Sequence, residues 1–319
     1  MPNSVSVTGT HRTLHTVTVD APAETVYGIV ADVTAWPQYF TPNVHVEHLE
    51  RDGATERIRI WATANGEVKN WTSRRVLDEA ALRVDFRQEV SQPPVAAMGG
   101  AWVVTPVDDR TSLLELHHDF DAVGDDPAGV EWITAAVDRN SAAELANIKE
   151  LAEAAGDLAE LVFSFDDTVH MAADGAVVFD FLNRADLWPE RLPHVARLDL
   201  TEDEPGVQVM AMDTSAADGS VHTTESVRVV FGQDRIVYKQ TTVPALMTAH
   251  TGRWTIEPAG DGVAVTSRHT VTLKPSAVEK VLGPGKTVAD AREYVHRALS
   301  TNSTRTLELA RQYAEARRG

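Results

Sequence analysis

The feature that most constrains the fold of this chain is that its second half repeats the motifs of its first half. The segment "TAWPQYF" recurs as "ADLWPERL", which aligns Trp36 with Trp188 at an offset of 152 residues. The segment "TSRRV" matches "ESVRV" at an offset of 153, and "AWVVTP" matches "RWTIEP" at 152. Matches in the same order with a nearly constant offset indicate a tandem duplication. We therefore expect two domains of one fold, residues 1–155 and 156–319.

A fourth match lies near the end of each copy, where "NSAAELANIKELAEA" aligns with "NSTRTLELARQYAEA" at an offset of 162. The additional residues fall in "KPSAVEKVLGPGK", 274–286, whose Pro and Gly content predicts a loop insertion. The matched segments lie in long amphipathic stretches, roughly 127–155 and 287–317, with apolar residues at helical spacing. Each copy is therefore predicted to end in a long helix.

Both copies show the same order of expected elements. A first strand, about 12–20 or 161–170, precedes a helical stretch that ends before Trp-Pro. Six alternating segments follow, separated by turn signals such as "DG" at 52–53 and "PP" at 93–94, a pattern typical of antiparallel hairpins. The sequence thus predicts an α+β fold of two tandem domains. Each is a seven-stranded antiparallel sheet wrapped around its long C-terminal helix, with an interior pocket between them.

Composition and motif searches exclude several classes of function. A net charge of −18 argues against nucleic acid or an anionic membrane as the main partner. The absence of cysteine excludes a thiolate metal site and a cysteine nucleophile, and the pairs His45/His48 and His117/His118 lack the carboxylates of a convincing metal site. Nucleotide-binding glycine motifs and a serine-hydrolase elbow are also missing. We expect no nucleotide, no metal, no membrane helix and a cytoplasmic protein.

The strand predicted at "NWTSRRV" raises the question of where its arginines point. Alternation places Trp71, Ser73, Arg75 and Leu77 on one face. The tryptophan and the leucine favour burial of that face, yet an arginine is rarely buried without a partner. Arg75 is therefore either one half of a closed ion pair or a residue that lines an internal cavity.

Two further polar residues fall in segments that are expected to be buried. His118 shares its strand face with Leu114, Leu116 and Phe120, which makes it either a satisfied core histidine or a catalytic group. Asn140 lies in the closing helix, where asparagine is a poor helix former. It either faces solvent or adds an amide to the same cavity.

These motifs together resemble the di-domain aromatase/cyclases of bacterial type II polyketide synthases. The resemblance rests on the duplicated plan, on Trp36-Pro37, on W-x-S-x-R at Trp71, Ser73 and Arg75, and on "RNS" at 139–141. It spans nearly the whole chain. It implies the START-like helix-grip fold, with a pocket between sheet and helix.

The resemblance also implies a reaction. Such enzymes receive a linear poly-β-ketone on the phosphopantetheine arm of an acyl carrier protein and act beside other synthase subunits. They promote first-ring aldol closure, for di-domain members commonly C7–C12, and dehydration to an aromatic ring, without a cofactor. The exposed Arg74 is a candidate for docking the acidic carrier protein.

The family's site residues carry over to matching positions of this chain. Arg75, Ser73 and His118 are the expected catalytic residues: Arg75 is expected to be unpaired and to bind an enolate or alkoxide oxygen, and His118 to move protons near neutral pH. Single-domain relatives can carry a tyrosine at the position of Asn43. This chain therefore lacks the hydroxyl of that tyrosine, unless Tyr39 supplies it. The expected substrate-binding residues are Trp36, Trp71, Tyr39, Asn43, Asn140, Trp188, Ser226, Arg228 and Asn302.

The second copy gives a conflicting pattern, because the apolar Val227 and Val229 alternate with Ser226 and Arg228. Either Arg228 points away from the pocket or the expected register is wrong by one residue. The first domain is therefore ranked first for catalysis. The competing class of function is a non-catalytic START-like carrier of a hydrophobic small molecule, since fold alone does not decide function.

Overall fold

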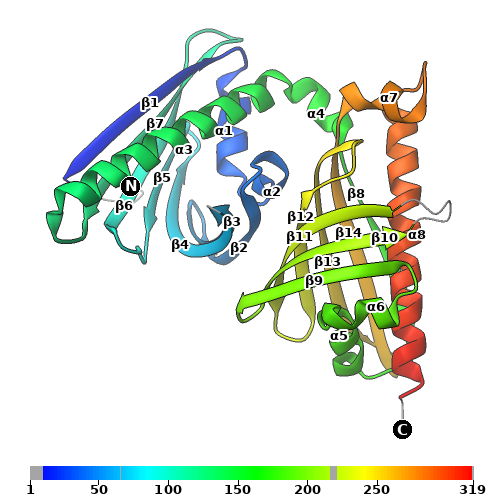
Figure 1. Ribbon diagram of the computed structural model, residues 1–319. Helices are drawn as coiled ribbons and strands as arrows, with labels where there is room; N and C mark the ends of the chain where they lie inside the picture. The colour runs from blue at the N-terminus through cyan, green and yellow to red at the C-terminus, as the bar shows by residue number, and fades with distance from the viewer. Residues whose placement is uncertain (1–9, 65, 216–220, 318–319) are drawn as a thin grey trace. The chain divides into compact units, whose positions relative to one another are not determined.

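The computed structural model describes residues 10–64, 66–215 and 221–317 (Figure 1). The chain divides into two compact units, Met1–Leu158 and Ala159–Gly319, here called the first and the second domain. The division falls within the short helix α4. Among the described helices, none is long and apolar enough to cross a membrane.

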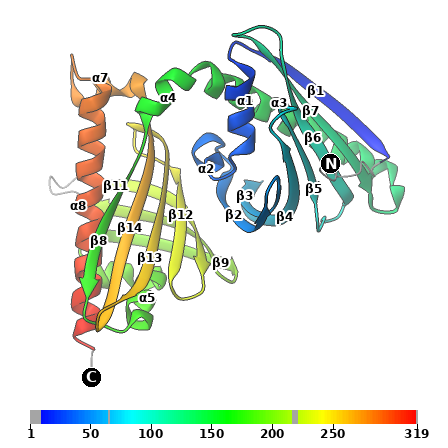
Figure 2. The same ribbon diagram turned by 180° about the vertical axis from the view of Figure 1, so that it is seen from behind.

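The first domain is a seven-stranded antiparallel sheet in the order β1-β7-β6-β5-β4-β3-β2. The long helix α3 packs against β1 and β7 (Figures 1 and 2). The elements are β1 (His11–Val19), α1 (Ala23–Ala31), α2 (Trp36–Tyr39), β2 (Asn43–Asp52), β3 (Thr55–Ala64), β4 (Glu67–Asp78), β5 (Arg83–Gln88), β6 (Val95–Pro106), β7 (Ser112–Ala122), the 3-10 turn η1 (Val123–Asp125), α3 (Pro127–Glu153) and α4 (Ala155–Leu161).

The second domain repeats this order as β8-β14-β13-β12-β11-β10-β9, with α8 packed against β8 and β14. The prediction of two seven-stranded antiparallel domains is confirmed. The elements are β8 (Val162–Met171), α5 (Gly175–Asn183), η2 (Ala185–Leu187), α6 (Trp188–Arg191), β9 (Val195–Glu204), β10 (Val207–Ser215), β11 (Val221–Phe231), β12 (Arg235–Thr242), β13 (Met247–Ala259), β14 (Gly262–Leu273), η3 (Pro275–Ala277), α7 (Val278–Leu282) and α8 (Val288–Glu315).

Local sequence explains where the long helices begin and which face they bury. The side chain of Asp126 caps α3 by accepting a hydrogen bond from the backbone N–H of Gly129, and proline occupies the first helical position. Thr287 and Asp290 form a capping box at the start of α8. The buried residues of α3 recur every three to four positions and so form one apolar stripe towards the sheet. They include Ile133, Val137, Ser141, Leu145, Ile148 and Ala152.

The hairpin between the second and third strands of each domain turns on a glycine with positive φ. Gly53 has φ of 56° and Gly206 has φ of 81°, a left-handed conformation that glycine adopts without steric cost. This turn sets the register of β3 on β2 and of β10 on β9. The next strand in each sheet carries the arginine that the sequence singled out.

Candidate functional site

Arg75 is fully enclosed in the first domain, with 2% of its surface exposed. Its Nη1 donates to Oε1 of Glu56 at 2.6 Å and to the carbonyl of Ala31 at 3.3 Å, and its Nη2 donates to the carbonyl of Val30 at 2.8 Å. Glu56 lies directly opposite Arg75 on β3 and is also 2% exposed. The expectation of an unpaired Arg75 is therefore wrong. The neighbouring strand supplies a buried carboxylate that neutralises the guanidinium.

Arg75 and Trp36 together hold the C-terminal end of α1. The indole N–H of Trp36 donates to the carbonyl of Ile29 at 3.2 Å, and the guanidinium carbon of Arg75 lies 5.1 Å from the centre of the tryptophan ring. The last carbonyls of a helix lack intrahelical partners, and the partial negative charge there favours a cation. Trp36 and Arg75 thus connect α1 to the sheet.

Arg228 occupies the same place in the second domain. Its Nη2 donates to the carbonyl of Leu182 at 2.6 Å, near the end of α5, and Trp188 donates to the carbonyl of Phe181 at 3.2 Å. The guanidinium carbon lies 5.2 Å from the ring of Trp188 and 5.6 Å from that of Trp254. Arg228 therefore points inward, and the conflict seen in the sequence is resolved: Val227 and Val229 are buried on the other face of the strand.

The two arginines differ in what lies opposite them. In the second domain the residue across from Arg228 is Gln208, which stands where the first domain has Glu56. The amide nitrogen of Gln208 donates to Glu202 at 2.8 Å, so this carboxylate binds the amide. The Nε and Nη1 of Arg228 have no hydrogen-bond partner among the described residues. Burial lowers the pKa of Arg228 to about 10, so the guanidinium remains charged at neutral pH.

Ser73 and Trp71 lie on the inner face of β4, as predicted. The hydroxyl of Ser73 donates to the backbone carbonyl of Arg87 on β5 at 3.1 Å. Trp71 is half-buried and packs on an apolar cluster that includes Ile58 and Ile60. Both side chains therefore already take part in the packing of the sheet.

His118 faces the interior beside Phe86, whose ring centre lies 5.6 Å away. Burial, together with the nearby His15 and His117, lowers the pKa of His118 to about 4. The imidazole is consequently neutral at pH 7, and the expectation of a pKa near neutrality is wrong. Its Nδ1 has no hydrogen-bond partner among the described residues.

The two helix asparagines are not in the interior. Asn140 and Asn302 are exposed, whereas the next residues, Ser141 and Ser303, are buried. The apolar stripe of α3 passes through Ser141, and this rotates Asn140 towards solvent. The expectation that these asparagines add amides to a pocket is therefore wrong.

The other expected substrate-binding residues lie close to the cores of their domains. Tyr39 is half-buried beside the core, and burial raises the pKa of its hydroxyl. Asn43 begins β2 and is half-buried. Ser226 is buried on β11, with Gln240 as its register partner on β12.

Sequence analysis missed a polar cluster in the second domain. The Nδ1 of His269 lies 3.0 Å from Nε2 of His250 and 3.3 Å from the hydroxyl of Tyr238, and the hydroxyl of Ser267 lies 3.2 Å from Nε2 of His269. The Nδ1 of His250 lies 2.9 Å from Oε1 of Gln240. An offset of 152 aligns Tyr238 with Phe86 and His250 with Met98, and these two polar replacements are the signal in the sequence that could have revealed the cluster.

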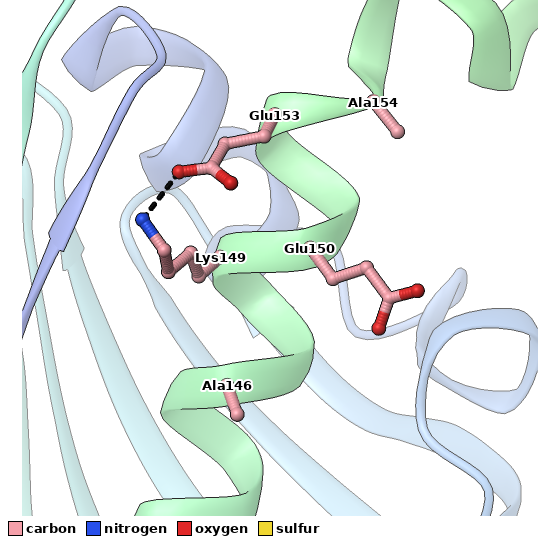
Figure 3. A pocket seen from close by; sticks show the side chains of 5 residues that line it. All are labelled: Ala146, Lys149, Glu150, Glu153 and Ala154. Atoms are coloured by element: carbon pink, nitrogen blue, oxygen red, sulfur yellow. Dashed lines mark hydrogen bonds and ion pairs between the residues drawn. The ribbon is translucent and has the colours of Figure 1, made fainter.

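Two hollows stand out in the described parts of the chain, and neither contains Arg75 or Arg228. One, of 370 Å³, lies between β8 and α8 and is bordered by Phe165, Arg292 and His296. The other, of 540 Å³, lies along the end of α3, where Lys149 binds Glu153 (Figure 3). The interior pockets remain a prediction. No group of three potential metal ligands is found among the described residues.

The chain is similar to proteins of known families over nearly its full length. The family model described as "Polyketide cyclase / dehydrase and lipid transport" matches residues 10–153 and again 162–311. The granaticin polyketide synthase bifunctional cyclase/dehydratase of Streptomyces violaceoruber is 46% identical over 98% of this chain and 97% of that protein. The actinorhodin polyketide synthase bifunctional cyclase/dehydratase of Streptomyces coelicolor is 47% identical over 95% of this chain and 96% of that protein.

Two solved structures share the full arrangement of elements. The di-domain ARO/CYC BexL from the BE-7585A biosynthetic pathway superposes with a TM-score of 0.89 at 57% identity, covering 96% of this chain and 99% of that chain. The di-domain ARO/CYC StfQ from the steffimycin pathway gives a TM-score of 0.86 at 38% identity, with the same coverage.

Proposed function

The chain belongs to the polyketide cyclase/dehydrase and lipid transport family and is a polyketide cyclase/dehydratase, and from this premise we propose the reaction and the site. The proposed substrate is a poly-β-ketone on the phosphopantetheine arm of an acyl carrier protein. The proposed reaction is the C7–C12 aldol closure of its first ring, followed by dehydration to an aromatic ring. The observation that carries the proposal is the guanidinium of Arg228, which is buried beside two tryptophans and has two nitrogens without a hydrogen-bond partner among the described residues.

The chemistry requires a cation of this kind. In the aldol step an enolate carbon attacks a ketone carbon, and the ketone oxygen becomes an alkoxide that takes up a proton. Loss of that hydroxyl with a neighbouring C–H proton releases water and forms the double bond. A fixed guanidinium stabilises enolate and alkoxide oxygens without losing its own proton. The first step forms a carbon–carbon bond and the second releases water, without net oxidation or reduction, so the reaction requires no redox cofactor.

We assign different tasks to the two domains. Arg228 has free donors and belongs to the proposed oxyanion site, with Trp188 and Trp254 as apolar walls for the folded chain. Holding a flexible chain in one geometry contributes much of the acceleration of such closures. In the first domain we keep Ser73 and His118 as proposed site residues and assign Arg75 a structural task. There, the pair of Arg75 with Glu56 gives a guanidinium whose charge is already compensated.

The carrier protein is proposed to dock on exposed arginines. Arg74 lies on the outer face of β4, opposite in direction to Arg75, and forms a long ion pair of 3.6 Å with Glu89. Arg57, its register neighbour on β3, binds the same carboxylate at 2.6 Å. Because the chain is strongly acidic, an acidic carrier would depend on such local positive charge.

Reconstitution with a minimal synthase and its carrier protein tests this proposal by product chromatography. Arg228→Ala is expected to lower formation of the first-ring product at least tenfold and to raise spontaneous shunt products. Arg228→Lys should restore only part of the rate, because an ammonium cannot make a planar two-pronged contact. The exposed Arg197 provides the control, since Arg197→Ala should leave the product profile unchanged. Arg74→Glu should raise the carrier concentration required for half-maximal rate.

Two results would contradict the proposal. If Arg228→Ala gives the wild-type product profile, the proposed site at Arg228 is wrong. If the product profile is the same with and without the protein, the result favours a carrier that only binds a hydrophobic molecule. The family description includes lipid transport. The polar groups inside the second domain favour catalysis over transport, because an apolar cargo leaves them unpaired.

A further inference from the structure

The second domain contains polar side chains where the first domain has apolar ones, although the backbone is the same. Tyr238 and His250 stand in the sheet positions of Phe86 and Met98. The ring of Tyr238 lies over Gly252 and that of Phe86 over Gly100, where a side chain on either glycine would collide with the ring. The packing of the ring is therefore equivalent in both domains. Tyr238 adds a hydroxyl that Phe86 lacks.

The hydrogen bonds of the cluster determine which atoms carry protons. The amide oxygen of Gln240 can only accept, so Nδ1 of His250 carries a hydrogen. Burial lowers the pKa of His250 to about 3, and a neutral ring then has a lone pair on Nε2. That lone pair faces Nδ1 of His269 at 3.0 Å, so this nitrogen carries a hydrogen. The remaining nitrogen of His269 accepts from Ser267.

This assignment leaves the proton of Tyr238 uncommitted. The hydroxyl oxygen lies 3.3 Å from Nδ1 of His269, and this nitrogen has no lone pair because it carries the hydrogen that it donates to His250, so Tyr238 cannot donate to it. Its own hydrogen then has no acceptor in the cluster. His269 and His250 thus offer the tyrosine hydroxyl no acceptor and leave it free to donate to a ligand.

Three further donors without partners lie around the same point. Arg228 is the register partner of Tyr238 on the adjacent strand, and both contact the ring of Trp254, at 5.6 and 5.3 Å. The Nε and Nη1 of Arg228 and the indole Nε1 of Trp254 are buried and have no hydrogen-bond partner among the described residues. Buried donors without acceptors are costly, and they are expected where a ligand supplies the acceptor.

Resting on the proposed function, we infer that Tyr238, Arg228 and Trp254 form an oxyanion-binding site in the second domain, specific for the enolised oxygens of a 1,3-dicarbonyl. A planar enolate offers two oxygens, which suit a guanidinium edge and a phenol that donate together. The tryptophan ring provides an apolar face for the conjugated carbons. His269 and His250 act as positioning residues through the tyrosine.

Binding of a simple 1,3-diketone tests this inference in the full chain. The probe is benzoylacetone (1-phenylbutane-1,3-dione), because its enolate absorbs at longer wavelength than its neutral enol. The wild-type protein should bind the probe and shift its absorption towards the enolate. Tyr238→Phe should weaken binding about tenfold or more and diminish the shift, as expected for loss of a hydrogen bond to a charged group. Trp254→Phe, which keeps a ring but loses the N–H, should weaken binding less.

A matched control comes from the first domain. Phe86 shows that this fold accepts phenylalanine over the glycine, so Tyr238→Phe should melt as the wild type does. Phe86→Tyr should leave probe binding unchanged. Equal dissociation constants for the wild type and Tyr238→Phe, or no enolate shift with the wild type, overturn the inference. Product formation is measured separately. If the protein forms the cyclised product but the wild type and Tyr238→Phe bind the probe equally, only this inference is wrong. If the wild type binds the probe but forms no cyclised product, only the proposed function is wrong.

Discussion

The ends of α1 and α5 are held in the same way by an arginine and a tryptophan, and they differ in one residue on the adjacent strand. Glu56 pairs with Arg75 in the first domain, whereas Gln208 faces Arg228 in the second. The carboxylate converts a buried guanidinium into a structural ion pair. The amide leaves the same group charged, and within the described part of the chain two of its nitrogens have no hydrogen-bond partner. The comparison teaches that a family motif marks the position of this arginine, while its neighbour decides whether the arginine is available to a ligand.

The largest expected effect is on stability and separates the two arginines. Arg75→Ala should lower the free energy of unfolding of the first domain by about 3–5 kcal/mol, because it removes the guanidinium that compensates the buried Glu56 and leaves this carboxylate with its contact to His48 at 2.8 Å. Arg228→Ala should cost the second domain about 1–2 kcal/mol, since it loses one carbonyl hydrogen bond and ring contacts but leaves no buried countercharge. Hydrogen exchange of peptides from each domain in urea measures both values in the full chain.

The double variant Arg75→Ala with Glu56→Ala provides the control and should recover part of the lost stability. Equal losses for the two single variants would mean that the ion pair contributes nothing beyond the helix contacts.

A smaller effect, on rate, is expected when the second domain is made to resemble the first. Gln208→Glu combined with Glu202→Gln places a carboxylate opposite Arg228 and keeps a hydrogen bond between the two positions. First-ring product formation should fall about tenfold, because the new carboxylate competes for the guanidinium. Glu202→Gln alone should change the rate little. An unchanged rate in the double variant would show that Arg228 does not need free donors.

The smallest effect is expected from pH. Burial lowers the pKa of His250 to about 3 and that of His269 to about 4, and in the first domain it lowers the pKa of His118 to about 4. These rings bind protons more readily when unfolded, so the stability they contribute is fully present above pH 6.5 and is lost as pH falls towards 4.

With two such histidines in its interior cluster, the second domain should lose more stability than the first between pH 6.5 and 4. Hydrogen exchange at both pH values measures the difference. His250→Gln should reduce the loss in the second domain alone. A parallel loss in both domains would mean that groups other than these histidines control the acid sensitivity.

Much of the fold could be predicted because its signals are local or repeated. The duplication, the seven strands of each copy and the two long helices follow from offsets, alternation and helical spacing. The inward direction of Arg75 also follows from alternation with Trp71. The partner of Arg75 does not, because Glu56 lies 19 residues away and meets it only through the register of β3 on β4.

Other parts of the site required three-dimensional contacts. Asn140 directly precedes the buried Ser141, and which of the two side chains faces the sheet depends on how the helix packs. Tyr238, His250 and His269 come from three strands, and no short motif connects them. The pKa of His118 depends on burial and on neighbouring histidines, neither of which a strand pattern reveals.

The pairing of β1 with β7 has a consequence for how the protein is made. The first strand of each domain can form its pairing only after the last strand, some 100 residues later, has been synthesised. During synthesis β7 therefore meets β1 before the equivalent strand β8 exists, and this order favours correct pairing of the repeats. His15 binds Asp138 of α3, whereas Asp167 binds Ser300 of α8. An exchange of first strands would place Asp167 beside Asp138, where the two carboxylates repel each other.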